Sequence, residues 1–130
     1  MSAARRVGID VGGTKCLAVA LDADGAVVGE ARRATPKGPA AIIDTLVELA
    51  TELGPAATLG VGVPGLVTRD GTLRAAPNLV DISDFQVGSL LRDRLGTDVE
   101  VDNDATCAAV AEWQLGAGRG ADDMVMVTLG

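Results

Sequence analysis

Three short segments near the start of the chain alternate between apolar and polar positions with the period of a β-strand. They cover residues 6–11, 16–21 and 26–33, and tight turns separate them at Gly12-Gly13 and at residues 22–25. A period of two is typical of a strand with one buried face, and short glycine-containing turns connect antiparallel neighbours. The pattern therefore predicts an antiparallel meander of three strands.

The apolar positions then change to helical spacing. Between residues 38 and 53 they form one stripe (Ile43, Leu46, Ala50 and Leu53), and Gly54-Pro55 ends the helix. The remaining predicted elements are a strand at 58–63, a turn-rich segment at 64–77 with a hairpin tip at 69–72, a helix at 85–95 capped by Ser83 or Asp84, a strand at 98–101, a helix at 105–115 and a strand at 124–129. This order predicts an α/β domain with a mixed sheet, three antiparallel strands followed by parallel strands, and helices on both faces.

Composition narrows the classes of function. The chain has 130 residues and a net charge of −7, without a basic cluster larger than a pair, so we expect it to bind neither nucleic acid nor an anionic membrane in general. No apolar run is long enough to cross a bilayer. Cys16 and Cys107 are far apart and fit small core residues of a reduced, cytoplasmic protein. Because the chain has no histidine, carboxylates must carry any proton transfer.

A first candidate site is the turn between the first two predicted strands, Asp10-Val11-Gly12-Gly13-Thr14-Lys15. Glycine tolerates positive φ and lets a ligand approach the backbone, and bare amides form an anion-binding concavity. Asp10 could hold Mg²⁺ through water. The segment lacks the spacing of a Walker A loop. The alternative is an ordinary tight hairpin turn.

A second candidate site lies where the predicted strand at 98–101 gives way to a helix. Asn103 and Asp104 are suited to a sugar hydroxyl and to accepting a proton, because ligands bind at the carboxyl ends of strands and a helix N-terminus favours a carboxylate. The alternative is simple helix capping. Gly65 and Asn78 belong to loops near the same edge, and their alternatives are an ordinary turn and an Asx-turn.

Five motifs occur in order: I-D-V-G-G-T-K, G-V-G-V-P-G, A-P-N-L, V-D-N-D-A and V-T-L-G. Together they resemble the amino-terminal half of ROK-family sugar kinases, with the bacterial glucokinases as the nearest type. The resemblance implies an actin-like ATPase (ribonuclease H-like) fold and transfer of the ATP γ-phosphoryl to a hexose hydroxyl, typically O6 of glucose. It implies that ATP is bound by Gly12, Gly13, Thr14 and Lys15, and that Asp10 acts at Mg²⁺. It also implies that the sugar is contacted by Gly65, Asn78, Asn103 and Asp104, with Asp104 as the general base.

The resemblance also sets the expected domain organisation. Residues 1–122 correspond to the amino-terminal domain and residues 123–130 to the first strand of a second domain. The family's zinc site and adenosine pocket lie outside this chain, so we expect the fragment alone to be inactive and its apolar last strand to favour a homodimer. Two alternatives remain, a sugar-responsive ROK regulator and a non-catalytic actin-like ATPase module. The sequence does not distinguish among hexoses or between ATP and polyphosphate.

Overall fold

A five-stranded mixed sheet forms the centre of the molecule. The computed structural model describes residues 5–79 and 81–129. The strands are β1 (Arg6–Val11), β2 (Lys15–Leu21), β3 (Val27–Ala34), β4 (Thr58–Val63) and β8 (Asp98–Asn103), in the spatial order β3-β2-β1-β4-β8. Neighbours among β1, β2 and β3 are antiparallel, whereas β1, β4 and β8 run parallel. This confirms the predicted meander and the parallel strands that follow it.

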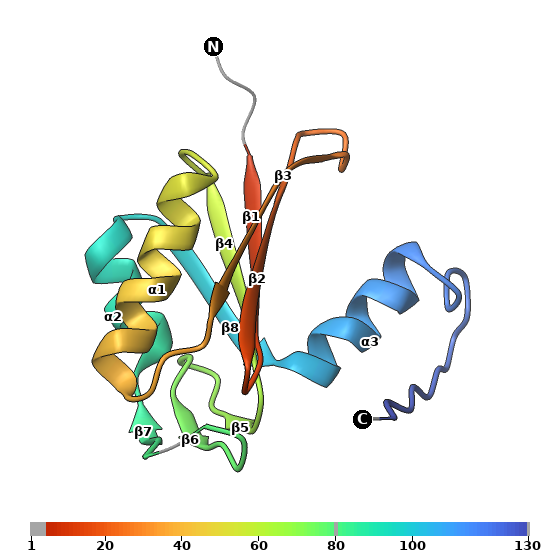
Figure 1. Cartoon of the computed structure of the whole chain (residues 1–130). Helices are drawn as coiled ribbons and strands as arrows, with labels where there is room; N and C mark the ends of the chain where they lie inside the picture. Colours follow the sequence, from red (N-terminus) through yellow and green to blue (C-terminus); the bar gives the residue numbers. More distant parts are fainter. Residues whose placement is uncertain (1–4, 80, 130) are drawn as a thin grey trace.

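Two helices cover one face of this sheet, α1 (Pro39–Glu52) and α2 (Val87–Leu95) (Figure 1). Alternate residues of β1 (Val7, Ile9 and Val11) are buried on this side and join buried residues of α1 and α2 in one cluster. Leu46 and Leu49 of α1 and Leu91 of α2 are completely buried there. The core therefore lies between the sheet and these two helices, which leaves the opposite face for the candidate site.

The opposite face of the sheet is only partly covered. Helix α3 (Asp104–Leu115) begins directly after β8 and extends away from the sheet, as Figure 1 shows in blue, and none of its residues is buried. Helices thus lie on both faces, but only the first turns of α3 approach the sheet. Cys107 of α3 is exposed, so the expectation that it is a core residue was wrong, whereas Cys16 is buried as predicted.

The strand predicted at 124–129 is absent: these residues form no regular structure. Their apolar alternation suits a strand, but a strand needs a hydrogen-bonded neighbour, and none lies beside this segment among the described residues. Val125, Val127 and Leu129 are therefore strongly exposed. Gly130, the last residue of the V-T-L-G motif, lies outside the described residues.

A second, small antiparallel sheet lies at the carboxyl ends of the parallel strands (Figure 1). It contains β5 (Leu66–Val67), β6 (Leu73–Ala75) and β7 (Ser83–Phe85) in the order β5-β6-β7. The hairpin tip at 69–72 is confirmed, since the Gly71 N–H donates to Thr68 O over 3.0 Å.

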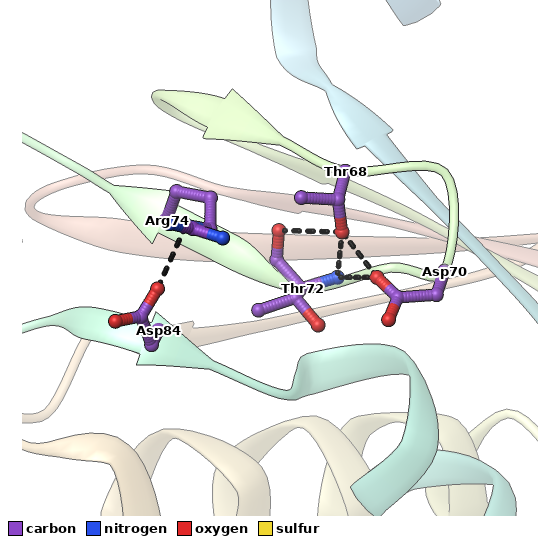
Figure 2. A network of polar contacts seen from close by, with 5 residues as sticks. All are labelled: Thr68, Asp70, Thr72, Arg74 and Asp84. Carbon is purple, nitrogen blue, oxygen red and sulfur yellow. Dashed lines mark hydrogen bonds and ion pairs between the residues drawn. The ribbon is translucent and has the colours of Figure 1, made fainter.

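Polar contacts stabilise this small sheet (Figure 2). The Thr72 N–H donates to Thr68 Oγ1 (3.2 Å) and to Asp70 Oδ1 (3.3 Å), and Thr68 Oγ1 donates to Asp70. The hydrogen bonds from Thr68 and Thr72 lower the pKa of Asp70. Arg74 forms an ion pair of 2.8 Å with Asp84, which joins β6 to β7. The network holds together the segment that follows β4.

The start of α2 also differs from the prediction. Ser83 and Asp84 belong to β7 and do not cap the helix; Gln86 is the N-cap. Asp84 has a φ of 47°, a conformation outside the right-handed helical region, so the helix cannot include it. Within the described residues no helix is long and apolar enough to cross a bilayer.

Candidate functional site

The strand register brings two aspartates to the open face of the sheet. Asp10 of β1 pairs with Gly62 of β4, and Gly62 pairs in turn with Asp102 of β8. Side chains at paired positions of neighbouring strands point to the same face. Asp104 lies two residues after Asp102, in the first turn of α3. The fold thus gathers Asp10 and Asp104, which the sequence analysis assigned to separate candidate sites.

An open cavity of about 520 Å³ lies between this face of the sheet and α3. Its lining includes both aspartates, Cys107 and three strand glycines, Gly8, Gly60 and Gly62. A Cβ at Gly62 would lie 3.5 Å from Asp104 Cα and 3.6 Å from Cys107 Sγ. Glycine at alternate strand positions therefore leaves room for the cavity and for the start of α3, a pattern that marks close approach of a ligand or backbone. Sequence analysis missed this signal.

The cavity is electrostatically unfavourable for negative charge. Partial burial raises the pKa of Asp10, and the charge of Asp104 raises it further. Burial also raises the pKa of the Cys107 thiol, with contributions from Asp102, Asp104 and Asp10. The thiol is therefore protonated and a poor nucleophile at neutral pH. A bound cation would reduce the repulsion between these carboxylates.

The donor set fits Mg²⁺ held partly by water. Across residues 5–79 and 81–129, no group of three or more His, Cys, Asp or Glu side chains is arranged to hold a metal ion directly. Mg²⁺ commonly uses one or two carboxylates and keeps several waters or phosphate oxygens. Asp10, which lines the cavity, would supply one such carboxylate.

The Gly12-Gly13-Thr14 turn closes the β1–β2 hairpin and begins two residues after Asp10. The Gly12 N–H donates to Lys15 O over 2.9 Å, so this amide is already used by the hairpin. For the N–H groups of Gly13 and Thr14, the described part of the chain provides no acceptor. These two amides remain available to an anion. Lys15 is exposed at the start of β2.

Close packing, not positive φ, accounts for the glycines of this turn. Neither Gly12 nor Gly13 has a left-handed φ. A Cβ at Gly12 would lie 2.9 Å from Lys15 O, and a Cβ at Gly13 would lie 3.0 Å from Asn78 O. The structure therefore brings the A-P-N-L loop against the turn, with Asn78 exposed beside Gly13.

Asn103 connects two of the predicted site segments. Its Oδ1 accepts from the Thr106 N–H (3.1 Å) and caps α3, and its Nδ2 donates to Gly65 O (2.9 Å). The capping alternative is thus confirmed for Asn103, and the same side chain also fixes the loop after β4. Gly65 has a φ of 121°, and a Cβ there would overlap the Ala75 carbonyl oxygen.

Asp104 is oriented by the helix that it begins. Its Oδ1 accepts from the Ala105 N–H over 2.8 Å, which leaves the second carboxylate oxygen for the cavity. A carboxylate at the first turn of a helix also interacts favourably with the helix dipole. The arrangement can accept a proton from a hydroxyl group bound in the cavity.

Thr35 is a further residue of the site, and the sequence analysis missed it. It follows β3, and its hydroxyl and N–H both bind the Gly12–Thr14 turn. The Thr35-Pro36 dipeptide marks a strand end, because the residue before proline favours extended backbone. Nothing in the local sequence indicates a contact with a turn more than twenty residues earlier.

Comparison with known proteins gives consistent relatives. The chain is 34% identical over 128 residues to a glucokinase of Streptomyces coelicolor, a match that covers 95% of this chain and 40% of the relative. It is 39% identical over 111 residues to an N-acetyl-D-glucosamine kinase of Salmonella gallinarum, covering 81% of this chain and 36% of the relative. The chain thus spans about two fifths of the length of these curated relatives.

Solved structures share its fold. A ROK family glucokinase from Streptomyces griseus in complex with glucose and AMPPNP superposes with a TM-score of 0.83 at 32% identity, covering 92% of this chain and 39% of that one. The inorganic polyphosphate/ATP-glucomannokinase from Arthrobacter sp. strain KM gives a TM-score of 0.81 at 34% identity, covering 91% and 51%. The predicted actin-like ATPase fold is confirmed. Since a sequence model of the ROK family also matches residues 6–130, the chain belongs to the ROK family.

Proposed function

We propose that this chain is the amino-terminal part of an ATP-dependent hexose kinase that phosphorylates O6 of glucose, with Asp104 as the general base. The observation that carries the proposal is the cavity that Asp10 and Asp104 line together, with the Gly13 and Thr14 amides, unpaired among the described residues, following Asp10 closely along the chain. Phosphoryl transfer requires positioning, charge neutralisation and a group that accepts the hydroxyl proton. In a chain without histidine, a carboxylate meets the last requirement.

Each residue of the site has a role in this proposal. Asp104, anchored by its bond to the Ala105 N–H, accepts the proton of the attacking hydroxyl through its free oxygen. The N–H groups of Gly13 and Thr14 bind phosphate oxygens, and we assign a supporting role to Lys15, the next residue along the chain. Asp10 orients the metal through water. Bound Mg²⁺ neutralises the phosphate charge and, in the cavity, the repulsion between Asp10 and Asp104.

The sugar side of the site is assigned to Gly65, Asn78, Asn103 and Asp104. Asn103 already uses Oδ1 and one Nδ2 hydrogen within the protein, so one amide hydrogen remains for a sugar oxygen. The support for glucose comes from relatives named as glucokinases and from the Streptomyces griseus structure, which holds glucose and AMPPNP. The Salmonella relative named as an N-acetyl-D-glucosamine kinase makes that amino sugar the second substrate to test.

We further propose that residues 1–122 form the amino-terminal domain and that residues 123–130 lead into a second domain. The coverage of the relatives supports this division, because the chain spans about 40% of their length. A cytoplasmic location and a homodimer complete the proposal. The 130-residue chain alone then provides half of a cleft and is expected to be inactive.

A coupled ADP-release assay with Mg-ATP and a panel of hexoses tests the function. It compares the 130-residue chain, the protein extended past Gly130 in its own reading frame, and two variants of the extended protein. Asp104→Asn should reduce kcat by at least about a hundredfold, the usual scale for loss of a general base. Asp93→Asn, an exposed aspartate of α2 outside the cavity, should leave it unchanged.

The assay also separates the kinase from the alternatives. Sugar binding measured by calorimetry, without turnover in the extended protein, would indicate a sugar-responsive regulator. ATP binding without sugar binding would indicate a non-catalytic ATPase-like module. Activity of the extended protein that survives Asp104→Asn would remove Asp104 as the base.

A further inference from the structure

Strand β3 ends at the same end of the sheet as the β1–β2 turn (Figure 1), and Thr35 is the residue that follows its last residue, Ala34. The register explains this position, because Lys15 pairs with Ala34 and the next residues on each strand are Thr14 and Thr35. Thr35 is half-buried. It is therefore the first residue beyond β3 that can contact the turn.

Three contacts join Thr35 to the turn and to β2. Its N–H donates to Thr14 O over 2.9 Å, and its Oγ1 donates to Gly12 O over 2.7 Å. Its Oγ1 also lies 3.4 Å from Cys16 Sγ. A hydroxyl has a single hydrogen, which the Gly12 carbonyl takes, so the buried Cys16 thiol is the donor in the third contact. Burial raises the pKa of Cys16, which keeps that thiol protonated and able to donate.

These contacts determine which way the turn's amides point. The Gly12 carbonyl and the Gly13 N–H belong to one planar trans peptide group, in which C=O and N–H point in opposite directions. The described residues contain no cis peptide bond. When Thr35 Oγ1 holds the Gly12 oxygen on one side, the Gly13 N–H is directed to the other side, where it has no acceptor within the described protein.

The glycines make such an anchor necessary. Lys15 O and Asn78 O approach Gly12 and Gly13 so closely that a residue with a Cβ would not fit at either position. Glycine loses the most backbone freedom on folding, so a Gly-Gly peptide without a fixed contact can rotate among many conformations. The Thr35 hydroxyl supplies the fixed contact at the peptide that joins the two glycines.

We infer that Thr35 is a positioning residue that orients the Gly13 N–H for the terminal phosphates of the nucleotide. Thr35 does not touch the phosphates itself; it acts through the Gly12–Gly13 peptide. The inference rests on the proposed kinase function for its ligand, while its effect on the turn is independent of any activity. A further role in specificity for the sugar is not expected, because Thr35 does not line the cavity.

The first test measures the turn directly in the 130-residue chain. Backbone ¹⁵N order parameters of Gly13 and Thr14 are compared in the natural chain, Thr35→Val, Thr35→Ala and Thr35→Ser. In the Val and Ala variants the Gly13 value should fall from about 0.85 to below about 0.6, the range of flexible backbone. Thr35→Ser keeps the hydroxyl and should restore the natural value. Thr58→Val makes the same change at an exposed threonine of β4 and should have no effect.

The second test uses the kinetics of the protein extended past Gly130. Loss of the hydroxyl should raise KM for Mg-ATP about tenfold, the equivalent of one hydrogen bond, with KM for the sugar unchanged. Thr35→Ser should stay within about twofold. Loss of a residue with a merely structural role would lower stability without raising KM for Mg-ATP selectively over KM for the sugar.

The outcomes are distinguishable. If the extended protein has no kinase activity, the proposed function fails, and the order parameters still decide whether Thr35 controls the turn. An ordered Gly13 in both Thr35→Val and Thr35→Ala overturns the inference. Thr35→Ala avoids a methyl group against the Gly12 carbonyl, so unfolding of this variant as well as Thr35→Val would show a general stabilising role and would also overturn it.

Discussion

Asp10 is a residue whose charge opposes folding. Its pKa is raised because it is partly desolvated and faces Asp104, so the folded protein binds its proton more tightly than the unfolded chain does. Stability is therefore lost as the pH rises from the ordinary pKa of an aspartate to the raised one, and the loss is complete above it. Such a cost is typical of functional sites, where charges are gathered for a ligand.

Replacing Asp10 with asparagine should therefore stabilise the isolated chain at pH 7. Because the group is accessible to solvent, the gain should be below about 1 kcal/mol and should vanish near pH 3, where the carboxylate is protonated. Urea unfolding at both pH values measures it, with Asp93→Asn as the matched control. In the extended protein the same variant should lose most activity. A variant less stable at pH 7 than the natural chain would contradict the unfavourable charge.

Gly65 is a residue whose side chain is excluded on two grounds. Its φ of 121° lies outside the regions available to other residues, and a Cβ would overlap the Ala75 carbonyl oxygen of β6. Gly65→Ala should destabilise the fold by about 2 kcal/mol or more, through strain and forced displacement of β6. Gly96→Ala is the control, because Gly96 has a φ of 63° and no atom near a built Cβ.

The two glycine variants are compared by urea unfolding. Gly96→Ala should cost only the conformational part, about 1 kcal/mol. An equal decrease in the free energy of unfolding for both variants would mean that the overlap with Ala75 O costs little free energy. In that case β6 does not constrain the loop after β4.

At the scale of elements, Asn103 joins helix α3 to the loop after β4. Asn103→Ala removes the N-cap and the donor to Gly65 O, and should cost about 2 kcal/mol in total. Asn103→Asp keeps an oxygen for the Thr106 N–H but loses the donor, so it should retain the helix and disturb the loop. Thermal unfolding followed by circular dichroism compares the two. Equal stability of the Asp variant and the natural chain would show that the bond to Gly65 contributes nothing.

The regular elements could be predicted because their burial follows from local periodicity. β1, β4 and α1 match the expected bounds to within one or two residues, since one face of each is buried against the core. The start of α2 could not be predicted in the same way. Ser83 and Asp84 are typical N-cap residues, yet pairing of Phe85 with Leu73 makes them part of a strand. A tertiary contact outweighed a local preference.

The candidate site was predictable in its residues and less so in its geometry. Asp10 and Asp104 are recognisable from their positions at strand ends, and the sheet register then brings them to one cavity. Thr35 and Cys107 could not be identified, because the first depends on a contact between distant segments and the second on how far α3 stands from the sheet. The use of the Gly12 N–H in hairpin closure could not be predicted either, because it depends on where the Lys15 carbonyl lies.

At the scale of the whole molecule, apolar residues gather on α3 and the segment after it. Val110, Trp113 and Leu115 are exposed, and so are Val125, Val127 and Leu129 at 90%, 75% and 94%. Trp113 Nε1 donates to Ala121 O over 2.8 Å, which folds this segment back along the helix. Exposed apolar surface and unpaired extended backbone both favour association with another chain. The proposed homodimer is thus expected to use residues 110–129.

Light scattering after size exclusion, over a range of concentrations, measures this association. The natural 130-residue chain should shift toward the dimer mass as concentration rises, because each copy removes apolar surface of the other from water. Val125→Lys with Val127→Lys should abolish the shift. Val27→Lys with Val28→Lys, also exposed but on β3, should leave it intact. If the β3 variant alone is monomeric, the association uses the outer edge of the sheet, and the apolar segment after α3 is not the interface.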